Sequence, residues 1–160
     1  MTVLIQGSQL RALLLGVRVQ RAAAVLPAGA ADGALFSVSG GRVLVTSLVG
    51  EVTVVMPGGA NSIKLKYNPT AAGSDFDLCT AVAITSDAVG QTYTLAGDVE
   101  TPGALLVGGA VGQANPAFAK PLMLSEGDIE VDCTDGQVTG QVAWTLTYIP
   151  LDDGAAVAAA

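Results

Sequence analysis

The sequence contains no histidine, and this absence excludes several kinds of chemistry. Histidine is the commonest general base in enzymes and supplies ligands to many zinc sites. The two cysteines, Cys79 and Cys133, are far apart and form no Cys-x-x-Cys knuckle. A Ser-His or Cys-His nucleophile system within this chain is therefore excluded, and a zinc centre is disfavoured.

Aromatic residues are also scarce, at 4% of the chain, although apolar residues make up 51%. The core must therefore be built from Val, Leu, Ile and Ala. No apolar run approaches the length of a membrane-spanning helix, so we expect no membrane partner. Polar residues interrupt the apolar N-terminus, which argues against a signal peptide.

Charge is distributed unevenly along the chain. Residues 1–31 contain Arg11, Arg18 and Arg21 and no acid, whereas residues 32–160 contain four basic and fourteen acidic residues. An acidic body repels phosphates, so nucleic acid is not an expected partner. The three arginines are either solvated or form an arm that anchors the chain to an acidic protein surface. We take them as the candidate anchoring residues.

The cysteines lie on segments that alternate between apolar and polar residues. We predict that both are buried free thiols that act as small apolar side chains, as in a reducing cytoplasm. A Cys79–Cys133 bridge is the alternative if their strands are neighbours.

The chain is organised around residues 34–67, which read as a strand, a Gly-Gly turn, a long strand, a second Gly-Gly loop and a third strand. The long strand, residues 42–56, is apolar at both odd and even positions. A strand of this kind is buried on both faces, either inside a sandwich or against another subunit. We therefore predict an oligomer contact at Val43, Val45, Val49 and Val55. Gly50, inside the strand, indicates a bulge or a close backbone approach.

Further short strands are predicted by alternation and turn residues. They lie at about residues 63–67, 75–85, 92–95, 104–107, 122–124, 129–133 and 138–148. Gly40-Gly41 suits a tight hairpin, and residues 128–149 read as another antiparallel hairpin. About eight or nine short strands indicate an all-β antiparallel sandwich or jelly roll with an extended N-terminal arm.

Three regions are expected. Residues 1–33 form the arm, with strand character from about Val17 to Val25 and a short helix from Ser8 to Leu15 as a possible start. Residues 34–151 form the sandwich body. Residues 152–160 form a small-residue tail that is loose unless it docks.

The carboxylates offer two candidate sites. Asp75 and Asp77 share one strand face about 6.5–7 Å apart, a spacing that overlaps inverting glycosidase pairs, but too few aromatics exist for a sugar cleft. Asp128, Glu130 and Asp132 suggest calcium, but they spread over about 13 Å, which favours a solvated face. The glycine-rich residues 104–120 lack the Gly-Lys-Ser/Thr of a phosphate loop. We expect no catalytic residue, metal or cofactor.

Three segments carry a resemblance to a known group of proteins. They are residues 36–43 with 50–53 (FSVSGGRV and GEVT), residues 68–79 (NPT…DLC), and residues 140–151 (GQV…WTLTYIPL). Together they resemble small virion proteins encoded in the structural gene blocks of tailed phages, particularly those of actinobacteria. The resemblance covers most of residues 34–157 and implies a β-rich decoration (cement) protein or a related head or tail component. It also implies an oligomer, often a trimer, and it carries over no site residues.

We therefore expect a non-enzymatic homotrimer that binds the major capsid protein on the surface of the virion. A tail, tail-tube or head-fibre component is the first alternative. A carbohydrate- or host-surface-binding β module is the second, and it requires exposed aromatic side chains. Tyr67, Trp144 and Tyr148 instead fall on apolar strand faces.

Overall fold

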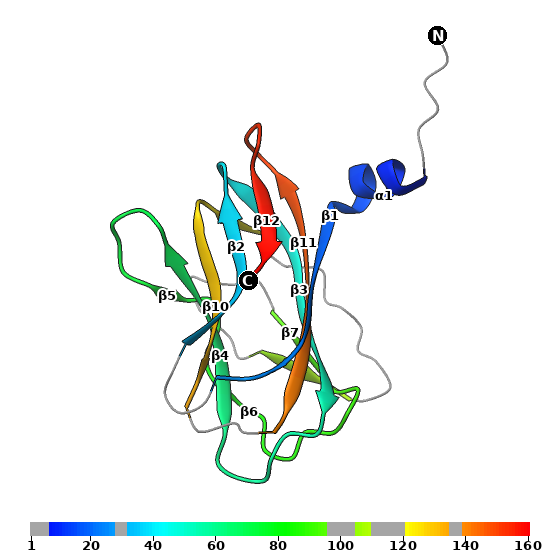
Figure 1. Ribbon diagram of the computed structural model, residues 1–160, viewed down its shortest axis with the longest axis vertical. Helices are drawn as coiled ribbons and strands as arrows, with labels where there is room; N and C mark the ends of the chain where they lie inside the picture. The colour runs from blue at the N-terminus through cyan, green and yellow to red at the C-terminus, as the bar shows by residue number, and fades with distance from the viewer. Residues whose placement is uncertain (1–6, 28–31, 96–104, 110–120, 135–138) are drawn as a thin grey trace.

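The computed structural model describes residues 7–27, 32–95, 105–109, 121–134 and 139–160. Two six-stranded sheets pack face to face, and every pairing between described strands is antiparallel (Figure 1). The predicted all-β antiparallel sandwich is therefore confirmed. Among the described residues, no helix is both long and apolar enough to cross a membrane.

Sheet A has the strand order β1-β11-β3-β7-β8, with β9 also paired to β3. Its strands are β1 (Val17–Val25), β3 (Val43–Val54), β7 (Thr92–Thr94), β8 (Leu106–Gly108), β9 (Leu122–Leu124) and β11 (Gln141–Pro150). Sheet B has the order β12-β2-β10-β4-β5, with β6 also paired to β4. Its strands are β2 (Asp32–Ser39), β4 (Ser62–Pro69), β5 (Phe76–Asp77), β6 (Val82–Ala83), β10 (Gly127–Cys133) and β12 (Ala156–Ala159).

Consecutive long strands cross between the sheets instead of pairing with each other. The predicted hairpin at residues 128–149 is wrong, because β10 belongs to sheet B and β11 to sheet A. The hairpin at Gly40-Gly41 is wrong for the same reason, since β2 and β3 lie in different sheets. Gly40 and Gly41 do form a turn, and both have positive φ, but this turn takes the chain from one sheet to the other.

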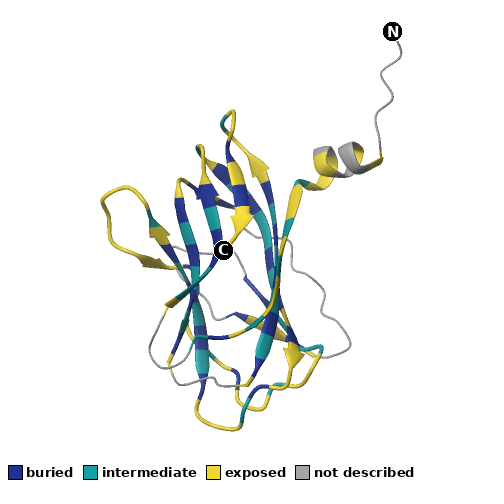
Figure 2. Ribbon diagram, in the orientation of Figure 1, coloured by how far each residue is buried: buried dark blue, intermediate teal, exposed yellow. Residues whose placement is uncertain are grey.

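The core lies between the sheets and follows the alternation of the strands (Figure 2). Trp144 on β11 is the largest fully buried side chain, and its indole lies over Gly50 on β3. A Cβ at Gly50 would lie 2.8 Å from the nearest ring atom. Gly50 therefore marks a close approach, as predicted, because only a residue without a side chain leaves room for this indole.

A bulge explains why β3 is apolar at both odd and even positions. Thr147 pairs with Ser47 and Tyr148 with Val45, so Thr46 is an extra residue on β3. Its hydroxyl donates a hydrogen bond to the carbonyl of Thr147 (3.2 Å). One extra residue exchanges the two strand faces. Odd residues therefore point into the core before the bulge, and even residues such as Leu48 point into the core after it.

Other predicted elements differ in extent. The single strand expected at residues 75–85 is two short strands, β5 and β6, which pair with β4 at separate places. The C-terminal tail docks, because β12 pairs with β2. The predicted strand at residues 104–107 corresponds to β8, and most of the rest of residues 104–120 lies outside the described residues.

The N-terminal region divides into two parts. Residues Gly7–Leu15 form helix α1, and β1 then pairs with β11 from Val17 to Val25. This half of the predicted arm is thus an edge strand of sheet A. The suggested boundary at residues 33/34 falls inside β2. In the described N-terminal region, α1 stands off the sandwich (Figure 1).

Candidate functional site

The outer face of sheet B carries a dense group of charged side chains. On β10, Asp128, Glu130 and Asp132 alternate with buried residues and point outward. The neighbouring strand β4 places Asn68, Lys66 and Lys64 directly opposite them, in that order. Cross-strand pairs of opposite charge stabilise an antiparallel sheet.

Each of the two lysines binds carboxylates from two segments. The Lys64 ammonium lies 2.9 Å from Asp77 and 3.4 Å from Asp132. The Lys66 ammonium lies 2.8 Å from Asp32 on β2 and 3.6 Å from Asp75, just before β5. Lys64 donates a hydrogen bond to Asp77, and this raises the pKa of Lys64, while the hydrogen bond that Lys66 donates to Asp32 raises the pKa of Lys66. The lysines therefore join β2, β4, β10 and the β5 segment.

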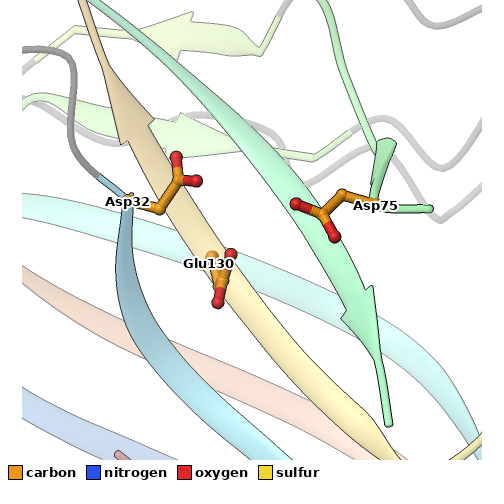
Figure 3. Close-up of side chains that lie close together, drawn as sticks. All are labelled: Asp32, Asp75 and Glu130. Carbon is orange, nitrogen blue, oxygen red and sulfur yellow. The ribbon is translucent and has the colours of Figure 1, made fainter. Parts of the chain in front are cut away.

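Asp32, Asp75 and Glu130 are close enough together to resemble a cation site (Figure 3). One carboxylate oxygen from each lies within 4.8 Å of the others. Oxygen ligands of this kind suit Ca²⁺. However, the Lys66 ammonium already contacts Asp32 and Asp75, and the Asn68 amide donates to Glu130 at 3.4 Å. The arrangement is an ion-pair network centred on a lysine.

The two carboxylate patterns noted in the sequence do not converge on one point. Asp128 accepts a hydrogen bond from the Ser37 hydroxyl (2.5 Å), whereas Asp132 contacts Lys64. Asp75 and Asp77 contact different lysines. Each of these carboxylates therefore binds a side chain on a neighbouring strand.

The predicted oligomer contact is wrong for two of its four residues. Val43 and Val45 are fully buried in the core of a single chain, because they precede the Thr46 bulge and point inward. Val49 is half-buried on the outer face of sheet A, and Val55 is 51% exposed at the end of β3. Only these two are accessible to another subunit.

The three candidate anchoring arginines do not lie on one free arm. Arg11 is in α1, whereas Arg18 and Arg21 are in β1. Arg18 is exposed. Arg21 donates a hydrogen bond from Nε to the main-chain oxygen of Ala160 (3.1 Å), and so links the edge of sheet A to the end of the chain beyond β12.

Both cysteines are buried free thiols, as predicted. They lie on opposite sides of β4, since Cys133 pairs with Ile63 and the Leu65 amide donates to the sulfur of Cys79. Burial raises the pKa of Cys79 to about 11 and that of Cys133 to about 12. A thiol that stays protonated is a poor nucleophile and a poor metal ligand.

No family model matches the chain, and it matches neither a curated protein nor a solved structure. The functional inference therefore rests on the fold and on the surface of the described residues.

The sequence patterns allowed a short helix from Ser8 to Leu15, but they did not identify two exposed apolar surfaces. The first is α1, where Leu10, Leu14 and Leu15 are 47%, 72% and 67% exposed. The second is a row of neighbouring side chains across the outer face of sheet A, which we call the apolar row: Met123 on β9, Leu44 on β3 and Ile149 on β11. The spacing of Leu10 and Leu14, four residues apart, is typical of one face of a helix and could be seen in the sequence. The apolar row could be recognised only once the pairing of its three strands was known.

Proposed function

We propose that this chain is a non-enzymatic virion protein, a decoration (cement) protein that binds the outside of a tailed-phage head as a homotrimer and stabilises it. The observation that supports this most is α1, which exposes leucines, contains Arg11 and no acid, and stands off an acidic sandwich. A stiff body with an unpacked basic segment suits attachment to a surface.

The buried aromatics favour attachment over sugar recognition. Tyr67, Tyr93, Trp144 and Tyr148 are each at most 5% exposed, and among the described residues only Phe76 is an exposed aromatic. A carbohydrate-binding module needs aromatic rings on its surface for stacking. The described part of the chain offers one such ring, at 42% exposure.

The expected partner is the major capsid protein, and the contact uses the basic N-terminal region. Arg18 is the exposed arginine of β1, and Arg11 lies in α1. A head presents many identical sites, so a modest affinity per copy becomes strong when linked copies bind together. Binding to the assembled state alone stabilises it by mass action.

Deleting residues 2–15 tests this proposal. The deletion removes α1 but leaves β1 and its pairing with β11. We expect the shortened chain to unfold at nearly the wild-type temperature but to lose co-sedimentation with heads that lack this protein. Full co-sedimentation of the shortened chain would refute anchoring through α1, and absence of binding by the wild-type chain would refute the function.

Arg18→Glu refines the test without shortening the chain. The side chain is exposed on β1, so the substitution should leave folding intact and weaken head binding by at least tenfold. Gln20→Glu is the matched control, because Gln20 is exposed on the same face of β1. Equal binding by Arg18→Glu and the wild type would exclude Arg18 from the contact.

A further inference from the structure

We propose that α1 of one copy packs on the apolar row of a second copy of this chain, and that this contact joins the subunits. The inference deepens the proposed function, on whose homotrimer it rests. It assigns the exposed leucines of α1 to the contact between copies, whereas Arg11 and Arg18 are the side chains proposed to contact the head.

Within the part of the chain that the structure describes, helix α1 packs little against other elements. It has nine residues, and its contacts with the other elements are few and made mainly to β1. An isolated helix shorter than about 12–15 residues is marginal in water. Its exposed leucines, Leu10, Leu14 and Leu15, are the side chains that packing would bury. A second surface therefore stabilises this helix.

Gly16 directs α1 away from its own sheet. Its amide donates to the Ala12 carbonyl (3.0 Å), and its φ of 89° ends the helix in the left-handed conformation. A Cβ at Gly16 would lie 2.6 Å from the Tyr148 carbonyl oxygen, so the glycine sits tightly against β11. Figure 1 shows α1 leaving beside β1 and projecting outward. Because this tight junction holds α1 away from its own sheet, the helix is placed to contact a neighbouring copy.

The apolar row fits the helix in size and character. Met123 and Ile149 are 62% and 42% exposed, and Leu44 lies half-buried between them. The row crosses three adjacent strands, a span of about 9.5 Å. Helix α1 is about 13.5 Å long, and Leu10 and Leu14 lie about 6 Å apart along one face. The two leucines can therefore contact neighbouring members of the row.

Charge favours a second copy as the occupant. Residues 7–27 contain three arginines and no acid, whereas residues 32–160 contain fourteen acids and four bases. Two exposed acids lie close to the ends of strands in the row. Glu126 is two residues after Leu124, where β9 ends, and Asp153 is two residues after Leu151, just beyond β11. The basic segment of one copy is thus attracted to the acidic body of the next. Contact between different patches builds a ring when the rotation closes, which suits a trimer.

Sedimentation velocity and native mass spectrometry of the free chain test this contact. We expect the wild type at a multiple of the 15.9 kDa chain mass, and three chains if the ring is a trimer. Leu14→Ser and Met123→Asp should each shift the mass to a single chain. Val89→Ser is the control, because Val89 is similarly exposed but lies in the turn before β7, outside the apolar row. A monomeric wild type, or wild-type mass in both variants, would overturn the proposal.

Cross-linking between copies tests the pairing directly. A Leu14→Cys chain mixed with a Met123→Cys chain should form an intermolecular disulfide on oxidation, while Leu14→Cys with Val89→Cys should not. The native cysteines are buried and do not compete. Equal cross-linking in both mixtures would also contradict the contact. An assembled chain that fails to bind heads would instead refute the head-binding function and leave this contact standing.

Discussion

At the scale of single residues, Gly50 is constrained by the side chain across the sheet. Its backbone φ is ordinary, so the requirement for glycine is steric and comes from the Trp144 ring. Sequence reasoning found this position because a lone glycine within a strand has few explanations. It could not identify Trp144, because that contact depends on the register between β3 and β11.

We expect Gly50→Ala to lower the free energy of unfolding by about 1–3 kcal/mol, since the new methyl would force the buried indole to move. Urea denaturation measures this. Gly109→Ala is the control, because no atom lies within 4 Å of a Cβ placed there, and it should not lose stability. Equal stability of Gly50→Ala and the wild type would contradict the close contact.

At the scale of elements, alternation predicted most strands, while turn residues misled the pairing. The Gly40-Gly41 turn reverses the chain, but the strands before and after it belong to sheet B and sheet A respectively. A turn motif specifies a change of direction, not the strand that the next segment joins. The Thr46 bulge was also impossible to predict from the pattern. One extra residue changes which valines face the core, but it does not change the composition of the strand. Val43 and Val45 were assigned to a subunit contact for this reason.

The ion pair between Arg42 and Asp152 joins the start of β3 to the turn after β11. The Arg42 guanidinium binds both carboxylate oxygens, at 2.9 Å and 2.8 Å, and its main-chain amide donates at 2.8 Å. These hydrogen bonds from Arg42 lower the pKa of Asp152 from 3.8 to about 2. The stabilisation is therefore complete above about pH 4 and is lost as the pH falls toward 2.

We expect Asp152→Asn to melt below the wild type between pH 5 and 7, with a difference that shrinks as the pH falls from about 4 to 2. Thermal unfolding followed by circular dichroism measures this. The neighbouring Asp153→Asn, at an exposed position, serves as the control. A melting difference that stays constant from pH 5 to 2 would show that the loss of Asp152 acts through something other than its charge.

At the scale of the whole molecule, the densest ion-pair network and the apolar row lie on different sheets. The ionisable groups of sheet B pair with one another across strands, whereas the apolar row crosses sheet A and three exposed leucines lie on α1. Composition predicted the basic N-terminal region and the acidic body. It could not predict that β1 belongs to the body while α1 projects from it, because this division depends on the pairing of β1 with β11.

Electron cryomicroscopy of the tailed-phage particles proposed to carry this chain tests the central claim most directly. The account predicts density for the two-sheet sandwich on the outer surface of the head, in clusters of three, with α1 of each copy against sheet A of its neighbour. Density on the tail, or none on the head, would contradict it.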